Sequence, residues 1–198
     1  MESGEEVKII DKIGWIGLGR MGSRIATRLR NAGSPLMVYD RDRSKTDELV
    51  SRGAERATSP AELAARADVI FSCVPDSAAV RSVYFGADGV LHGVKPGARI
   101  VEMSTVAPET TRHLFNAGRE REIQVLDVAM SGSTPAAESG SLTLFGGGDR
   151  EAFDIVAPIF PAIARQWFYM GPSGSGVSMK LVVNALLGVG MRSRRRSR

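Results

Sequence analysis

The sequence contains little cysteine and no long apolar run. Cys73 is the single cysteine among 198 residues, so the chain cannot form an internal disulfide, which is typical of proteins from a reducing compartment. No apolar stretch approaches the roughly 18 residues that suggest a membrane span. Residues 1–6 are acidic in character and lack the basic head and apolar core of a signal peptide. We therefore expect a cytoplasmic protein without a membrane partner.

The sequence also lacks groups of metal ligands and a hydrolase triad. The two histidines, His92 and His113, are isolated, and no cluster of His, Cys, Asp and Glu has metal-ligand spacing. No order of Ser, His and Asp suggests a hydrolase. Cys73 is interpreted as a small buried side chain at the end of a strand rather than as a nucleophile. The sequence therefore predicts no metal site.

The excess of positive charge is confined to one end of the chain. The formal net charge is +4, and residues 192–198 hold five arginines and no acid, so without them the charge is −1. Such a segment could bind nucleic acid electrostatically. A solvated end with no partner is the simpler interpretation. We therefore expect no nucleic-acid partner.

Composition and patterning indicate an α/β protein. Hydrophobic residues make up 43% and charged residues 24% of the chain, as in ordinary globular proteins. Apolar strand-like segments alternate with segments of helical periodicity, which predicts βαβ units. We expect strands at 12–17, 36–40, 68–74, 99–103, 124–128, 142–145 and near Trp167. We also expect a turn at 146–148, a helix over 149–164 and a last apolar helix over 177–191. The predicted fold is a Rossmann-type, doubly wound, mainly parallel sheet.

A glycine-rich motif points to a dinucleotide. Gly17-Leu18-Gly19-Arg20-Met21-Gly22 has the spacing G-x-G-x-x-G, follows a predicted strand and opens a predicted helix. Asp40 ends the next strand, 18 residues after Gly22, where the dinucleotide fingerprint expects an acid. Gly17 would permit the tight turn, Gly19 the approach of the pyrophosphate, and Gly22 the close packing of helix and strand. The helix N-terminus would bind the phosphates.

The residues around Asp40 bear on the choice of cofactor. Asp40 would accept hydrogen bonds from the ribose hydroxyls and repel a 2′-phosphate, which favours NAD. Arg41, Arg43 and Lys45 follow and could meet that phosphate, so NADP stays possible. The loops 73–76 and 103–105 follow two further strands and are expected to line the cofactor, because ligands bind at the carboxyl ends of such strands.

Two more polar segments are candidates for chemistry. Ser131-Gly132-Ser133 could hold a carboxylate through N–H groups and hydroxyls, or could be only a polar loop. Lys180 and Asn184 lie four residues apart in an otherwise apolar helix, so they share one face. A partly buried lysine can act as a general acid or base, and Asn184 could orient an oxygen. The alternative is that Lys180 is a surface lysine at the edge of the apolar stripe.

Taken in order, these motifs resemble the β-hydroxyacid dehydrogenases, the family of 3-hydroxyisobutyrate dehydrogenase, tartronate semialdehyde reductase and glyoxylate/succinic semialdehyde reductase. The residues that carry the resemblance are the glycine motif, Val74-Pro75-Asp76, Ser104-Thr105, 127–133, 140–143, and 171–176 with Lys180 and Asn184.

The resemblance implies hydride transfer between a nicotinamide cofactor and a short 3-hydroxy acid or the matching aldehyde acid. It further implies that Lys180 is the general acid/base and that Asn184 assists it. The same resemblance assigns the substrate carboxylate to Ser131, Gly132 and the Ser133 amide, and contacts with the cofactor to Val74, Pro75 and Thr105.

The sequence departs from the family pattern in three places. The usual Asp-Ala-Pro-Val-Ser-Gly-Gly reads Asp-Val-Ala-Met-Ser-Gly-Ser at 127–133, and one of two frequent asparagines is Val183. The family also continues into a helical second domain of roughly 100 residues, which closes the site and builds a homo-oligomer. Here the last apolar helix runs into the arginine-rich segment, so we expect a truncated form whose parent is the homo-oligomer.

The expected organisation follows from these departures. It is a leader at 1–11, an NAD(P)-binding domain at 12–174, the start of an interdomain helix at 175–191, and a disordered basic tail at 192–198. The competing interpretation is a non-catalytic dinucleotide-binding module whose tail binds nucleic acid.

Overall fold

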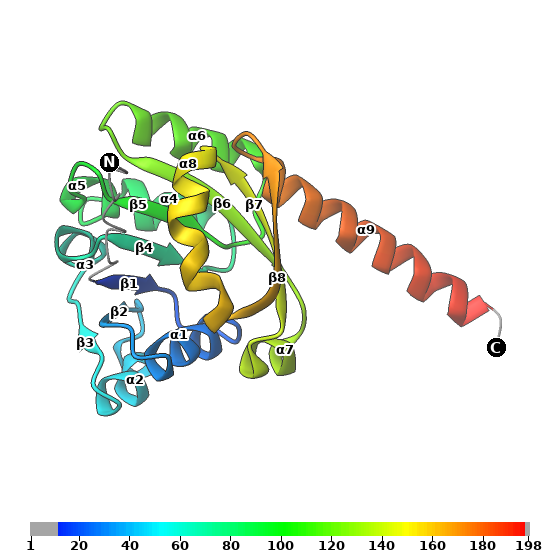
Figure 1. Cartoon of the computed structure of the whole chain (residues 1–198), viewed down its shortest axis with the longest axis horizontal. Helices are drawn as coiled ribbons and strands as arrows, with labels where there is room; N and C mark the ends of the chain where they lie inside the picture. The colour runs from blue at the N-terminus through cyan, green and yellow to red at the C-terminus, as the bar shows by residue number, and fades with distance from the viewer. Residues whose placement is uncertain (1–11, 197–198) are drawn as a thin grey trace, which may run out of the picture.

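A single mixed sheet organises the chain. The computed structural model describes residues 12–196, with side chains described up to residue 188, so the predicted leader 1–11 and residues 197–198 lie outside it. Its sheet has the strand order β3-β2-β1-β4-β5-β6-β7-β8 (Figure 1). The strands are β1 Ile13–Ile16, β2 Leu36–Tyr39, β3 Glu55–Arg56, β4 Val69–Ser72, β5 Arg99–Glu102, β6 Gln124–Ser131, β7 Leu142–Gly148 and β8 Ala164–Gly171. The β6–β7 pair is antiparallel and the others are parallel. The predicted Rossmann-type, mainly parallel sheet is confirmed.

Helices cover both faces of the sheet. The helices are α1 Gly22–Asn31, α2 Asp47–Ser51, α3 Pro60–Arg66, α4 Ser77–Phe85, α5 Val90–Gly93, α6 Pro108–Arg119, α7 Thr134–Ser139, α8 Arg150–Val156 and α9 Ser175–Arg196, with 3-10 turns η1 Arg43–Thr46 and η2 Ala157–Ala162. One core cluster joins α1, α2, α7 and α8 to the sheet, and a second joins α3, α4, α5 and α6 to its other face. Successive strand residues alternate between the two, because side chains on a strand point to opposite faces. Trp15 stacks on Phe71 in the first cluster, at 5.7 Å between ring centres, while Ile16 and Ile70 lie in the second.

Local capping chemistry sets several helix starts. Ser59 caps α3, with Pro60 at the first helical position, and the Ser59 hydroxyl accepts the Glu62 N–H at 3.1 Å. Asp76 and Asp149 cap α4 and α8 in the same way. These side chains satisfy N–H groups that have no partner inside the helix.

The glycines 146–148 are not the predicted turn. They continue β7, where Gly147 pairs with Asp127 and Gly146 with Val128. A Cβ on Gly147 would lie 2.7 Å from the Asp127 carboxylate, and one on Gly146 would collide with the ring of Phe153. These glycines are therefore needed for close packing of a buried strand, and the sequence pattern resembled a turn because both uses favour glycine.

Other element boundaries also differ from the predictions. The helix expected over 149–164 is α8 followed by η2, which contains Pro161 and so lacks one backbone donor. Helix α9 is described as far as Arg196, so it runs into the arginine-rich segment. The short elements β3, α5 and α7 were not predicted. No helix in the described part of the chain is long and apolar enough to cross a membrane.

The buried carboxylate of Asp127 fixes the start of α9. Asp127 lies on β6, is 2% exposed, and accepts the N–H groups of Gly174 at 2.7 Å and Val177 at 2.9 Å. Asp127 thus caps the N-terminus of α9 from a strand that is distant in the sequence. After this anchor the helix extends away from the sheet (Figure 1), which leaves Leu186 68% exposed.

We expect Asp127→Asn to lower the free energy of unfolding by about 2–3 kcal/mol, because an amide group would face two buried donors. The matched control is Asp149→Asn, an exposed cap on which asparagine serves nearly as well, so the change should stay within about 0.5 kcal/mol. Urea denaturation of the three proteins measures both values. Equal stability of the two variants would contradict the anchoring role of Asp127.

Candidate functional site

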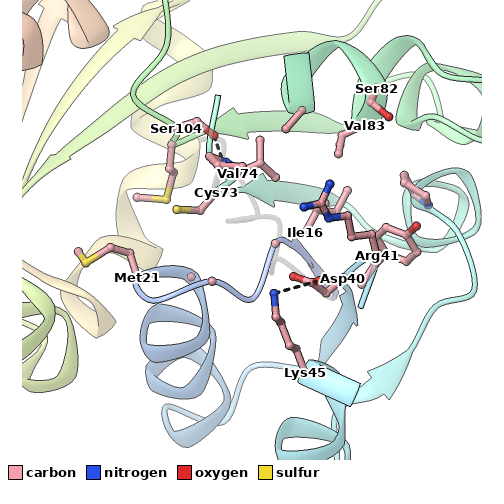
Figure 2. A pocket seen from close by; sticks show the side chains of 18 of the residues that line it. Ile16, Met21, Asp40, Arg41, Lys45, Cys73, Val74, Ser82, Val83 and Ser104 are labelled. Atoms are coloured by element: carbon pink, nitrogen blue, oxygen red, sulfur yellow. Dashed lines mark hydrogen bonds and ion pairs between the residues drawn. The ribbon is translucent and has the colours of Figure 1, made fainter. Parts of the chain in front are cut away.

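A cleft opens where the parallel strands end. Its volume is about 880 Å³. Strand β1 lies between β2 and β4. Strands β2 and β3 lie on one side of β1, and the strands from β4 onward lie on its other side. Such a switch point is where open α/β sheets bind their ligands. The cleft walls come from the glycine turn, the end of β2, the loops after β4 and β5, helix α4 and the start of α9 (Figure 2).

The glycine turn brings backbone against backbone. Gly17 has φ +93°, and a Cβ there would collide with the carbonyl oxygen of Cys73. A Cβ on Gly22 would collide with the carbonyl oxygen of Gly17, so α1 and β1 can approach this closely only with glycine at that position. By contrast, a Cβ on Gly19 would meet no atom within 4 Å. The turn is therefore tight at its two ends and open toward the cleft in its middle.

The N-terminus of α1 is available for an anion. Its cap residue, Met21, makes no side-chain capping bond, and the first turn contains no acid. Free N–H groups and the positive end of the helix dipole favour phosphate here. Arg20 and Arg41 are exposed and line the same cleft. The geometry fits a pyrophosphate.

Asp40 supports the turn as well as facing the cleft. Its Oδ2 accepts the Leu18 N–H at 2.7 Å, and its Oδ1 accepts the Asp42 N–H at 2.9 Å. The Lys45 ammonium lies 3.8 Å from Oδ1 (Figure 2). Each carboxylate oxygen keeps a lone pair toward the cleft, where ribose hydroxyls could bind. The cations next to Asp40 that line the cleft are Arg41 and Lys45.

The loops after β4 and β5 are joined by hydrogen bonds. The Ser104 hydroxyl accepts the Val74 N–H at 2.8 Å (Figure 2). The Ser104 N–H is in turn donated to the buried carboxyl of Glu102 at 2.5 Å. Burial raises the pKa of Glu102 above its usual value, although the hydrogen bonds from Ser104 and Ser72 oppose the rise. Beside them, burial and the negative Glu102 raise the pKa of Cys73 to about 12, so this side chain is a neutral thiol.

Lys180 reaches the cleft from α9. It is half-buried, and this burial lowers its pKa because the charged form loses water. A lysine with a lowered pKa can exchange a proton near neutral pH more readily than a free one. Met130 and Gly132, at the end of β6, line the same part of the cleft.

The structure brings most of the predicted site residues together. Those that line the cleft are Gly17, Gly19, Arg20, Met21, Gly22, Asp40, Arg41, Val74, Pro75, Thr105, Gly132 and Lys180. The four that do not are Leu18, Ser131, Ser133 and Asn184. The side chain of Leu18 belongs to the core, and Asn184 is exposed on α9.

Sequence reasoning missed one wall of the cleft. That wall consists of Ala79, Ser82, Val83 and the segment 86–88, from α4 and the loop after it. Small and apolar side chains of this kind carry no chemical signature. The spacing of Ala79, Ser82 and Val83 at one helix face was the available signal. No group of three or more potential metal ligands occurs among the described residues.

The fold and the cleft together define a dinucleotide-binding domain. Comparison with known families agrees. Residues 12–171 match the family described as the NAD binding domain of 6-phosphogluconate dehydrogenase, and the chain belongs to that family. The predicted NAD-binding domain is thereby confirmed.

Several relatives with similar sequences or structures are named dehydrogenases. The chain is 42% identical over 178 residues to the NAD-dependent L-serine dehydrogenase of Pseudomonas aeruginosa, covering 90% of this chain and 60% of the relative. The solved structure of Mycobacterium tuberculosis 3-hydroxyisobutyrate dehydrogenase with L-serine has a TM-score of 0.86 at 25% identity, over 91% of this chain and 61% of that one. Psf3 in complex with NADP+ and 2-OPP has a TM-score of 0.84 at 32% identity, over 87% and 61%. The chain thus spans about 60% of the length of these relatives. The expected likeness to 3-hydroxyisobutyrate dehydrogenases is confirmed.

Gly19→Ala separates cofactor binding from folding. The added methyl meets nothing in the free protein, so we expect the melting temperature to stay unchanged. It would occupy the space for the pyrophosphate, so NADH affinity should fall about tenfold or more, as loss of one good phosphate contact would produce. Calorimetric titration and thermal melting measure the two quantities. Gly22→Ala is the contrast, since it should lose stability as well. An unchanged NADH affinity of Gly19→Ala would contradict the proposed phosphate position.

Proposed function

We propose that this chain is the cofactor-binding part of an NAD-dependent dehydrogenase that oxidises short 3-hydroxy acids to aldehyde acids, or reduces them in the opposite direction. The observation that carries the proposal is the position of Lys180 in the same cleft as the glycine turn and Asp40. A cofactor held by the turn and a substrate held near Gly132 would meet at this lysine. The names of the relatives support the substrate class, because L-serine and 3-hydroxyisobutyrate both carry a hydroxyl on the third carbon.

The chemistry divides between cofactor and protein. When bound, the nicotinamide accepts or supplies the hydride. In the oxidation, the neutral amine of Lys180 takes the proton of the substrate hydroxyl as the hydride leaves the same carbon, and in the reduction the ammonium returns it. Burial lowers the pKa of Lys180, which favours the neutral amine that the oxidation needs. Asn184, one helical turn further along, assists by orienting the substrate oxygen.

The substrate carboxylate is assigned to the end of β6. Ser131 ends that strand, Gly132 lines the cleft, and Ser133 caps α7. Backbone N–H groups and hydroxyls at this corner suit a carboxylate. We assign residues 12–174 to the cofactor domain and 175–191 to a helix that leads away from it. The exposed apolar side chains Leu181, Val182, Leu186 and Leu187 support the homo-oligomer that the resemblance implies.

The preference for NAD over NADP rests on Asp40. We expect the wild-type chain to bind NADH more tightly than NADPH, because the Asp40 carboxylate repels a 2′-phosphate. Asp40→Asn keeps an acceptor for the Leu18 N–H and removes the charge, so the ratio of NADPH to NADH affinity should rise about tenfold. Adding Lys45→Ala to Asp40→Asn should lower this ratio of NADPH to NADH affinity again. Tighter NADPH binding by the wild type would assign the phosphate to Arg41 and Lys45 instead.

Lys180 should show its role in two independent ways. Lys180→Met should cut hydride transfer from L-serine or 3-hydroxyisobutyrate about 100-fold or more and change NADH affinity less than about twofold. Amine-labelling rates measured across pH should place the titration of Lys180 below the usual range of a lysine amine, because burial lowers its pKa. Unchanged turnover in the variant would end the acid/base assignment. NADH binding without any turnover would favour a cofactor-binding module that is not an enzyme.

A further inference from the structure

A buried carboxyl lies directly beneath the cofactor cleft. Glu102 ends β5, is 1% exposed and does not line the cleft. It takes part in none of the ion pairs of the described residues. A carboxyl without a cation is costly to bury, and an apolar side chain of similar size would cost less. Its presence therefore needs a reason other than stability.

Every partner of Glu102 is a neutral donor. Oε1 accepts the Ser104 N–H at 2.5 Å, and Oε2 accepts the hydroxyl of Ser72. Behind Ser72, the Tyr84 hydroxyl lies 2.6 Å from the serine oxygen. Glu102 thus ties together β4, α4 and the loop after β5.

One branch of this network reaches the cleft. Glu102 holds Ser104 by its backbone N–H, and the Ser104 hydroxyl accepts the N–H of Val74. Both Ser104 and Val74 line the cleft. Val74 belongs to the loop after β4 and Ser104 to the loop after β5, so a single buried group sets the separation of the two loops. The other branch ends at Tyr84, which is fully buried and does not line the cleft.

The two loops belong to one half of the cleft. The Val74–Ser104 pair and the Asp40–Lys45 pair lie on opposite sides of the pocket in Figure 2. An acid at the end of β2 holds the adenosine ribose, so the half across the switch point takes the nicotinamide. Lys180 lines the cleft as well, where the reacting carbon of the cofactor must come.

We propose that Glu102 is a positioning residue for the nicotinamide half of the cofactor, acting through Ser104 on Val74. This inference rests on the proposed function in one respect, namely that the ligand is a nicotinamide dinucleotide. Glu102 does not touch the cofactor. It holds the walls of the nicotinamide pocket at a fixed distance before the cofactor binds. Because the two loops are already ordered, binding costs little conformational entropy.

The test compares a whole dinucleotide with its adenosine half. Glu102→Gln keeps the shape but leaves one acceptor oxygen where the carboxylate had two, so the hold on Ser104 weakens. We expect about tenfold weaker NADH binding, the fold-change that loss of one hydrogen bond to a charged group produces. ADP-ribose reaches only the Asp40 side and the phosphates, so its affinity should change less than about twofold. Calorimetric titration of the whole chain with both ligands supplies the numbers.

Three further variants make the result specific. Ser104→Ala should reproduce the effect, and the double variant should be no weaker than Glu102→Gln alone, because the two act in series. Tyr84→Phe is the matched control: it removes a hydroxyl from the branch away from the cleft, so it should lower the melting temperature and leave NADH affinity unchanged. If Glu102→Gln fails to fold, the NADH and ADP-ribose affinities of Ser104→Ala decide the matter. They show whether the network positions the nicotinamide pocket or serves only stability.

The outcomes also separate this inference from the proposed function. An equal loss of NADH and ADP-ribose affinity would show that Glu102 serves only stability and would overturn the proposal. Full additivity of the two substitutions would overturn it as well. A wild-type chain that binds ADP-ribose and not NADH would defeat both proposals together, whereas wild-type NADH binding that no variant weakens would defeat this one alone.

Discussion

The structure depends on a backbone contact between β1 and α1. The carbonyl of Gly17 meets Gly22 without room for a side chain on either partner. This contact lets the helix begin directly at the end of the strand, with its N–H groups facing the cleft. Trp15 secures the same carbonyl by donating its indole N–H to Gly17 at 2.9 Å. The cleft exists because the chain turns so sharply here and continues outward on both sides of β1.

A second constraint joins the far half of the sheet to the helix that carries Lys180. Asp127 on β6 holds the start of α9, and the same strand ends at Ser131 four residues later. The lysine and the end of β6 are thus set by one buried group. Asp40 plays a comparable part on the other side, since it both holds the glycine turn and lines the cleft. In both places a carboxylate that binds backbone also fixes where a ligand can lie.

The features that could be predicted from the sequence are those that depend on neighbouring residues. The glycine motif, Ser59 with Pro60, and Asp40 after a buried strand each follow from spacing within a few residues or one βαβ unit. The glycines 146–148 were misread because their reason is contact with Asp127 and Phe153, which only the folded sheet supplies. The roles of Glu102 and of the α4 wall of the cleft were not predicted, for the same reason. Their roles come from residues brought together across strands, and no local pattern records that.

The thiol beside the glycine turn has a consequence for reactivity. Cys73 lies in the cleft wall, and its pKa of about 12 keeps it protonated at any physiological pH. Aldehydes are electrophiles that thiolates capture as hemithioacetals, and peroxides attack thiolates far faster than thiols. An ionised cysteine in this wall of the cleft would be open to both reactions. The burial that raises this pKa therefore gives the cleft an inert wall.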